Sequence, residues 1–336
     1  MIDLIERTEP LVDAFRRPIT YLRISVTDRC NLRCVYCMPE SGLPWIPKPD
    51  ILSYEELAEI VRAAASVGVH SIRLTGGEPL IRRELDQLVA LLHAIPGIDD
   101  IALSTNGLLL ADQAARLRAA GLGRVNVSLD TLDAERFRTI ARRPGLERVL
   151  AGIDAAIAAG LGPVKINCVL MRGTNDDELE AFAALTRTRA VHVRFIEVMP
   201  VHENVTLQGQ AWISSDEVLD RLRELGALHP VENVHGNGPA RMFAYAGARG
   251  TIGVISPLAH DYCERCNRVR LSADGRLKLC LFGDHLIDLR TPLRAGEGEE
   301  AIVALLRGAM HVKPERHHLR LGETSAAMRA FSEIGG

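Results

Sequence analysis

The sequence contains no hydrophobic run long enough to cross a membrane, and its first residues lack the basic-then-apolar order of a signal peptide. Aromatic residues make up only 4% of the chain, and the formal net charge is −3 with a pI near 6.4. The chain therefore lacks both the stacking surface and the basic field typical of proteins that bind nucleic acid or anionic lipid. These absences predict a cytoplasmic globular protein with no nucleic-acid partner and no membrane partner.

Lysine is scarce, because only Lys48, Lys165, Lys278 and Lys313 are lysines among 40 cationic residues. Codon bias is the simplest interpretation of that imbalance. The cysteines number seven, which is odd, and in a chain without a secretory signal they do not indicate a disulfide framework. Their spacing is more informative. The length of 336 residues favours about two domains.

Six short β-rich runs alternate with helical runs between residues 21 and 196, at close to the ~30 residues that a βαβ unit needs. Such alternation predicts a parallel sheet. Ser53 and Glu56 have the spacing of a capping box that opens a helix, and Ser214 and Glu217 repeat it. The expected strands are Tyr21–Val26, Ser71–Leu74, Ile101–Ser104, Arg124–Leu129, Val164–Val169 and Val191–Ile196.

Within nearly every expected strand, one parity is apolar and the other is polar, as where Leu22 and Ile24 alternate with Arg23 and Ser25. A closed eight-stranded barrel fills its interior with branched apolar side chains. Six strands with a polar inner face instead predict an α/β fold, an incomplete parallel β/α barrel (a partial TIM barrel) around a polar cavity. An exposed sheet face is the alternative. Four cations share the polar parity, which favours an anionic ligand; they are Arg23, Arg73, Lys165 and Arg194.

A segment rich in proline, glycine and asparagine, residues 233–239, marks an expected boundary. β-like pieces follow it at Met242–Ala246, Thr251–Ile255 and Val269–Leu271, around a second group of cysteines. We therefore expect a core domain over residues 15–235 and a smaller C-terminal domain over residues 236–336.

The first cysteine group is Cys30, Cys34 and Cys37, with the spacing Cys-x3-Cys-x2-Cys directly after the first expected strand. Loops at the carboxyl ends of parallel strands carry the active sites of such folds. Thiolates are the usual ligands of iron–sulfur clusters, and three cysteines leave one iron of a four-iron cluster open. A structural zinc site fits less well, because such sites are closed by four ligands. The spacing predicts a [4Fe–4S] cluster with an open iron.

The second cysteine group is Cys263 and Cys266, followed by Cys280 after thirteen intervening residues. On spacing alone, a zinc ribbon is an equally good interpretation. Its fourth ligand would come from His260, Asp284 or His285.

The segment from Cys30 to Cys37 and the run from Thr75 to Pro79 (TGGEP) resemble the radical S-adenosylmethionine superfamily. That resemblance implies that S-adenosylmethionine binds the open iron through its amino and carboxylate groups and yields a 5′-deoxyadenosyl radical. It also implies that Tyr36 lies by the adenine and that Gly77 receives the methionyl amino group. Ser128 and Met199 are the other implied S-adenosylmethionine contacts.

Further along, the run from Cys263 to Arg270, the strand segment Lys165-Ile166-Asn167 and the final Gly335-Gly336 resemble the GTP 3′,8-cyclase family of molybdenum cofactor biosynthesis (the MoaA family). The resemblance implies that Cys263, Cys266 and Cys280 hold a second [4Fe–4S] cluster, whose open iron contacts guanine. In that family the radical removes hydrogen from C3′ of GTP, and the resulting carbon radical attacks C8 of the base.

The resemblance implies that the chain is a lyase. Because the sequence has no Gly-x4-Gly-Lys-Ser/Thr loop, we expect side chains to hold the triphosphate. Arginine suits this role because its fork binds phosphate oxygens in pairs. The glycines of the tail are expected to enter the active site. The expected catalytic residues are Cys30, Cys34, Cys37, Arg268 and Arg270, and the expected GTP contacts are Arg23, Arg73, Ser104, Lys165, Arg194, Arg268, Arg270, Gly335 and Gly336.

The implied partners are GTP, an electron donor and the next enzyme of the pathway, cyclic pyranopterin monophosphate synthase. A monomer or a homodimer is expected. A radical enzyme that modifies peptides is the nearest alternative, although its auxiliary domains typically carry seven or more cysteines. A non-catalytic zinc-binding adaptor is the alternative from another class.

Overall fold

The computed structural model describes residues 9–199, 211–232, 234, 236–258, 260 and 262–318. One mixed sheet of twelve strands organises this part of the chain, in the order β12-β11-β10-β1-β2-β3-β4-β5-β6-β9-β8-β7. Its central strands are β1 (Tyr21–Ser25), β2 (Ser71–Thr75), β3 (Asp100–Thr105), β4 (Arg124–Ser128), β5 (Val164–Leu170) and β6 (Val191–Glu197). These six are parallel neighbours in chain order, which confirms the predicted parallel β/α arrangement.

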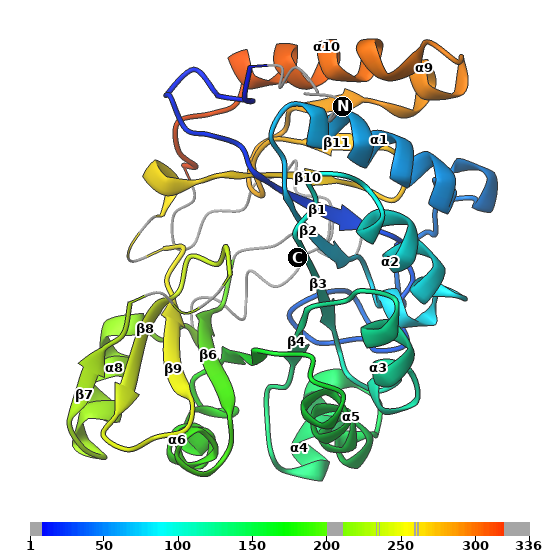
Figure 1. Ribbon diagram of the computed structural model, residues 1–336. Coiled ribbons are helices and arrows are strands. Elements are labelled where there is room, and N and C mark those ends of the chain that lie inside the picture. The colour runs from blue at the N-terminus through cyan, green and yellow to red at the C-terminus, as the bar shows by residue number, and fades with distance from the viewer. Residues whose placement is uncertain are drawn as a thin grey trace, which may run out of the picture.

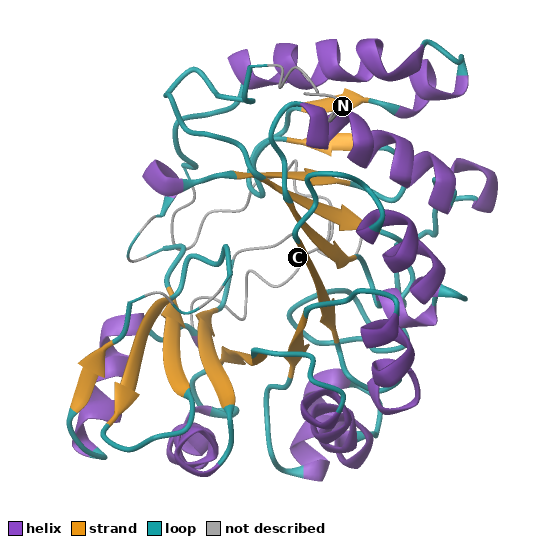
Figure 2. Ribbon diagram, in the orientation of Figure 1, coloured by secondary structure: helices purple, strands orange, loops and turns teal. Residues whose placement is uncertain are grey.

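The sheet is curved and helices cover its outer face, so the strands form the inner layer of the molecule (Figures 1 and 2). Ser53 accepts a hydrogen bond from Glu56 N and the Glu56 carboxylate accepts from Ser53 N, so the predicted capping box is present. Ser214 likewise accepts from Glu217 N. The helices are α1 (Tyr54–Ser66), α2 (Leu85–His93), α3 (Leu110–Ala119), α4 (Ala134–Ala141), α5 (Leu146–Ala158), α6 (Leu179–Thr188), α8 (Ser215–Glu224), α9 (Arg290–Arg294) and α10 (Gly298–His311).

Residues beyond the expected boundary extend the same sheet at both of its edges. Strand β9 (Thr251–Ile255) pairs in parallel with β6, and β10 (Arg268–Leu271) pairs in parallel with β1. Short antiparallel strands then finish the edges. On one side these are β8 (Arg241–Tyr245) and β7 (Leu228–Pro230), the second of which lies before the expected boundary, and on the other side they are β11 (Arg276–Lys278) and β12 (Leu286–Asp288). The C-terminal residues thus stand on both sides of the polar inner face.

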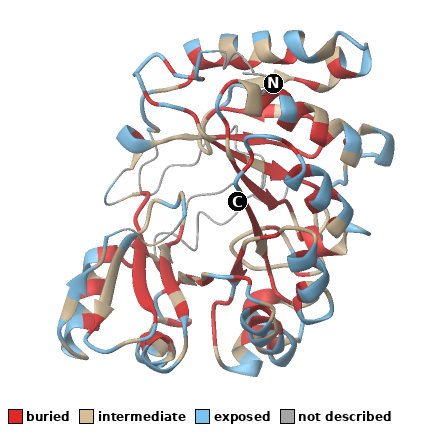
Figure 3. Cartoon of the chain, viewed as in Figure 1, coloured by how far each residue is buried: buried red, intermediate tan, exposed pale blue. Residues whose placement is uncertain are grey.

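The hydrophobic core lies between the sheet and its outer helices, where buried residues line the facing surfaces (Figure 3). Leu22, Ile24 and Ile72 are among its members, so the apolar parity packs as predicted. Cys168 is also fully buried in this core. Among the described residues, no helix combines the length and the hydrophobicity needed to span a bilayer.

Candidate active site

A cavity of about 260 Å³ lies on the polar inner face of the sheet. It brings together most of the residues singled out from the sequence, from both cysteine-bearing halves of the chain. Lys165, Cys263, Cys266 and Cys280 are not on its wall, and Gly335 and Gly336 lie outside the described residues. The predicted residues on the wall are Arg23, Cys30, Cys34, Tyr36, Cys37, Arg73, Gly77, Ser104, Ser128, Arg194, Met199, Arg268 and Arg270.

Three thiols line this cavity, those of Cys30, Cys34 and Cys37, on the loop that follows β1, the cysteine loop. Cys37 N donates to Cys34 O at 2.9 Å, which closes a tight turn between two of them. Burial raises the pKa of the Cys34 thiol well above its usual value, and the charges of Asp130, Cys37 and Cys30 raise it further. A group of sulfur donors close enough to influence one another, on a cavity wall, fits an iron–sulfur cluster, whose binding displaces the thiol protons.

The glycine-rich loop after β2 packs directly on the cysteine loop. Gly77 N donates to Thr27 O at 2.8 Å, and a Cβ at Gly77 would lie 2.1 Å from Arg29 O. A Cβ at Gly76, where φ is +137°, would lie 2.3 Å from Thr27 O. Contact between the two loops therefore excludes side chains at both positions, which is a reason for glycine beyond the close approach of a ligand expected from the sequence.

Glu78 joins these loops to the end of β3. Its buried carboxylate accepts hydrogen bonds from Thr105 Oγ1 at 2.7 Å, Asn106 N at 2.6 Å and Leu80 N at 3.0 Å. Asn106 Nδ2 in turn donates to Asn31 Oδ1 at 2.7 Å, within the cysteine loop. Burial raises the pKa of Glu78 to about 7, although these hydrogen bonds oppose the rise.

Asp130 joins the cysteine loop to β4 and β5. Its Oδ2 accepts from the Tyr36 hydroxyl at 2.7 Å, and its Oδ1 accepts from Val169 N at 2.8 Å. Burial raises the pKa of Asp130 to about 6, against the effect of both hydrogen bonds. The aromatic residue expected beside the adenine is therefore held by a buried carboxylate on the cavity wall.

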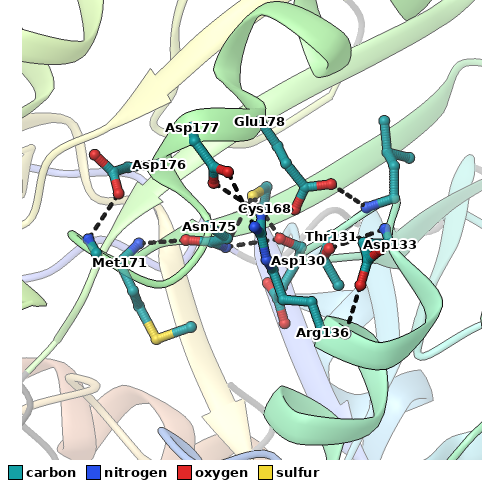
Figure 4. A network of polar contacts seen from close by, with 12 residues as sticks. Asp130, Thr131, Asp133, Arg136, Cys168, Met171, Asn175, Asp176, Asp177 and Glu178 are labelled. Carbon is teal, nitrogen blue, oxygen red and sulfur yellow. Dashed lines mark hydrogen bonds and ion pairs between the residues drawn. The ribbon is translucent and has the colours of Figure 1, made fainter.

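A polar network fixes the backbone around Asp130 (Figure 4). Asn175 Nδ2 donates to Asp130 O at 2.7 Å, and Asn175 Oδ1 accepts from Met171 N at 2.7 Å. Arg136 on α4 pairs with Asp177 and Glu178 at 2.7 and 2.8 Å. The loops after β4 and β5 are thus locked to each other, which holds Asp130 in place.

Three arginines that stand side by side on adjacent strands also line the cavity. In the sheet register, Arg23 on β1 is the direct partner of Arg270 on β10 and of Arg73 on β2. Like charges directly opposite one another destabilise a sheet. Burial lowers the pKa of Arg23 well below its usual value, and Arg270 lowers it further. Such a row gains stability when an anion binds between its members.

Tyr21 lies between two of the predicted GTP contacts. Its hydroxyl accepts a hydrogen bond from Arg73 Nε, and its ring centroid is 5.8 Å from the Arg73 guanidinium and 5.9 Å from that of Arg268. Burial alone would raise the pKa of Tyr21, but the charges of Arg73, Arg23 and Arg268 outweigh it and lower the pKa to about 8. The ring therefore orients arginines of two strands toward one cavity.

Lys165 is buried just behind the wall, under the loop between β7 and β8. A Cβ at Gly236 in that loop would lie 2.8 Å from Lys165 Nζ. Burial lowers the pKa of Lys165 to about 7, and the charges of Arg194, Arg124 and Arg73 add to the effect. The same loop reaches the arginines, because Arg268 Nη2 donates to Asn237 O at 3.2 Å.

The second cysteine group lies next to the wall, where Tyr262 and Leu281 line the cavity. Burial alone would raise the pKa of Cys266, but Lys313 and Arg268 outweigh it, and the pKa lies below its usual value. A lowered pKa favours the thiolate that binds metal. His260, one of the alternative zinc ligands, instead pairs with Asp216 at 2.8 Å. The part of the chain that the structure describes contains no group of three His, Cys, Asp or Glu side chains placed to hold a single metal ion.

Sequence reasoning missed Tyr21, Asp130, Asn237 and Tyr262. The first two were within reach, since Tyr21 shares the polar parity of Arg23, and Asp130 continues that of Ser128 beyond the strand end. The other two come from the C-terminal loops, whose path over the cavity leaves no local signal in the sequence.

The fold and this site define a radical S-adenosylmethionine enzyme. The pattern of the Radical SAM superfamily matches residues 24–186, and that of Molybdenum Cofactor Synthesis C matches residues 191–319. The chain belongs to the GTP 3′,8-cyclase family. It is 50% identical to the GTP 3′,8-cyclase of Pelotomaculum thermopropionicum over 325 residues, which cover 96% of this chain and 99% of the relative.

Other comparisons agree. Identity to the GTP 3′,8-cyclase of Moorella thermoacetica is 48% over 324 residues, or 96% of this chain and 99% of that one. Among solved structures, Streptococcus suis SuiB bound to S-adenosylmethionine matches with a TM-score of 0.57 at 15% identity, covering 90% of this chain and 68% of SuiB. That likeness shows a shared fold.

Proposed function

We propose that this chain cyclises GTP in the cavity between the cysteine loop and the row of arginines. Its activity is that of its family, the radical 3′,8-cyclisation of GTP in molybdenum cofactor biosynthesis, with S-adenosylmethionine and two [4Fe–4S] clusters as cofactors. The observation that supports this location is that thiols and arginines, which suit a cluster and a triphosphate, face one cavity. We divide the chain into a radical core, residues 15–235, and an auxiliary cluster domain, residues 236–336.

The part of the cavity lined by the cysteine loop is assigned to the first cluster and S-adenosylmethionine. Cys30, Cys34 and Cys37 are the proposed ligands, and the proposed S-adenosylmethionine contacts are Tyr36, Gly77, Ser128 and Met199. When bound, these cofactors supply a carbon-centred radical that removes a hydrogen atom from the GTP ribose. The buried carboxylates of Glu78 and Asp130 hold the loops in position around them.

The part of the cavity lined by the row of arginines is assigned to the triphosphate. Arg23, Arg73 and Arg270 face it from adjacent strands, and Tyr21 orients Arg73 and Arg268. A triphosphate carries enough negative charge to offset the mutual repulsion of these side chains. Ser104 is a further proposed contact, and its Oγ lies 3.4 Å from Arg73 Nη1. The other proposed contacts are Arg194, Lys165 behind the wall, and the tail glycines Gly335 and Gly336.

The second triplet, Cys263, Cys266 and Cys280, is assigned to the auxiliary cluster, and Arg268 and Arg270 are assigned to catalysis beside it. The proposed partners are an electron donor for the first cluster and cyclic pyranopterin monophosphate synthase, to which the product is transferred; no nucleic-acid or membrane partner is proposed. The protein is proposed to be a monomer or a homodimer in the cytoplasm.

Anaerobic incubation of the reconstituted protein with GTP, S-adenosylmethionine and dithionite tests the proposal. Mass spectrometry is expected to detect 5′-deoxyadenosine together with an isomer of GTP. Arg23→Ala and Arg73→Ala are expected to lose the GTP isomer while retaining iron. Cleavage of S-adenosylmethionine with no product from GTP in the unmodified protein would instead favour a peptide-modifying radical enzyme.

A further inference from the structure

The few lysines of this chain are concentrated in its interior. Of four lysines among 40 cationic residues, Lys165, Lys278 and Lys313 are 4%, 2% and 2% exposed. Lysine carries a compact ammonium, whereas arginine carries a broad planar fork, so the two are not interchangeable at a confined position. Codon bias does not explain why three of the four lysines are buried.

Lys313 follows α10 and reaches two of the three segments that carry the second cysteine triplet. Its Nζ lies 3.6 Å from Cys266 Sγ and donates to Leu279 O at 2.8 Å. Leu279 immediately precedes Cys280 in the chain. One ammonium group therefore spans the Cys266 segment and the Cys280 segment.

Arg17 reaches the third segment from the stretch of chain that precedes β1. Its Nη1 donates to Cys263 O at 2.8 Å, and its Nη2 donates to Pro314 O at 2.7 Å. This contact connects the Cys263 segment to the residue after Lys313. Arg17 has a buried carboxylate partner, because its Nε pairs with Asp13 at 2.6 Å.

Lys313 differs from Arg17 in the nature of its partners. Within the described residues, the contacts of its ammonium are a carbonyl and a cysteine sulfur, with no carboxylate in ion-pair range. A buried cation without a counterion is unfavourable. A negatively charged sulfur ligand at Cys266 would supply the missing charge, so the position of Lys313 suits a protein that has its cluster bound.

We propose that Lys313 is a positioning residue for the auxiliary iron–sulfur cluster, holding the Cys266 and Cys280 segments together and offsetting the negative charge of the cluster. The proposal rests on the assignment of Cys263, Cys266 and Cys280 to that cluster. Hydrogen bonds to the sulfurs and net charge set the reduction potential of such clusters. Lys313 therefore makes the auxiliary cluster easier to reduce than it would be beside a neutral side chain.

The test uses reconstituted full-length protein in which Cys30, Cys34 and Cys37 are alanine, so that the auxiliary cluster is the only cluster observed. In this background, the midpoint potential is measured by redox titration followed by electron paramagnetic resonance. Lys313→Met and Lys313→Gln are expected to shift it to more negative values, and Lys313→Arg, which keeps the charge, is expected to stay closer to the parent. Iron is also expected to leave both neutral variants faster when a chelator is added.

Arg316→Met is the matched control, because Arg316 is another cation near the Cys263 segment, 3.5 Å from Glu264, but its side chain is 45% exposed. Its potential is expected to equal that of the parent. If Lys313→Met assembles no cluster yet keeps the parent circular dichroism spectrum, the positioning role is supported, and Lys313→Gln supplies the potential.

Two negative results are distinguishable. An unchanged potential and an unchanged rate of iron loss in both neutral variants would overturn the role of Lys313 alone. If the parent protein, in which Cys30, Cys34 and Cys37 are alanine, binds no iron, the assignment of the auxiliary cluster is overturned, and the role of Lys313 with it.

Discussion

The hydroxyl of Tyr36 donates a hydrogen bond to Asp130 Oδ2 at 2.7 Å, and this bond connects the cysteine loop to the carboxyl end of β4. The second oxygen of Asp130 is already used by Val169 N on β5. The position of Tyr36 is therefore set by two strands distant from its own loop. A residue expected to contact the adenine is thus oriented by contacts within the protein.

Tyr36→Phe and Asp130→Asn are expected to weaken S-adenosylmethionine binding, each by roughly tenfold or more, because hydrogen bonds to charged groups contribute about 1.5–3 kcal/mol. The double variant is expected to lose little more than either single variant, since Tyr36→Phe removes the donor of this hydrogen bond and Asp130→Asn removes the charge of its acceptor. Anaerobic calorimetry measures the three dissociation constants, with GTP affinity as the control. Fully additive losses would show that the two side chains act independently.

Glu78 gives the protein a specific pH dependence of stability. Its pKa is about 7 in the folded chain against 4.5 as the usual value, so the folded state binds the proton more tightly than the unfolded state. The stability from this group is complete below pH 4.5 and is lost as the pH rises to about 7. Relative to Glu78→Gln, the unmodified chain is expected to lose about 3 kcal/mol over that range. Urea unfolding of cofactor-free protein measures the difference, and parallel pH curves for the two proteins would refute it.

Arg268→Ala and Arg270→Ala are each expected to weaken GTP binding by about ten- to a hundredfold, the value of one charge-assisted hydrogen bond to phosphate. Iron content is expected to stay unchanged, because both side chains are assigned to substrate binding and neither is a proposed cluster ligand. Arg276→Ala is the control, since Arg276 is on the neighbouring strand β11 but pairs with Asp274 at 3.2 Å, away from the cavity wall. Wild-type GTP affinity in both cavity variants, measured by calorimetry, would contradict the assignment.

Cys168 is expected to have a structural role only. It is fully buried in the core, and its Sγ lies 3.7 Å from Asp130 O. A buried free cysteine behaves as a small hydrophobic residue. Cys168→Ala is expected to keep the iron of both clusters and most of the activity, with a modest loss of thermal stability. Iron analysis checks this, and a loss of half the iron would mean that Cys168 serves a cluster.

The strands of the core were predictable to within one or two residues, because each one is bounded by a helical run and has one apolar parity. Parity also placed Arg23, Arg73 and Arg194 on the cavity side, since side chains of a strand alternate between its faces. The position of the first cysteine triplet at the cavity was predictable from its place directly after β1.

The arrangement of the C-terminal residues was not predictable in the same way. Strands β7, β11 and β12 have three residues each, too few to show an alternating pattern. The surroundings of the second triplet come from segments around residues 17, 263–280 and 313, which no local pattern connects. The burial of Lys165 behind Gly236 likewise depends on a loop far away in sequence.

We propose that hydrogen is removed from C3′ of GTP in the cavity shared by the thiols and the arginines. Reconstituted protein incubated with S-adenosylmethionine, dithionite and GTP carrying deuterium at C3′ tests it most directly. Mass spectrometry is expected to find the deuterium in 5′-deoxyadenosine and to show that the cyclised product has lost it from C3′. A cyclised product accompanied by 5′-deoxyadenosine free of deuterium would contradict the removal of hydrogen from C3′.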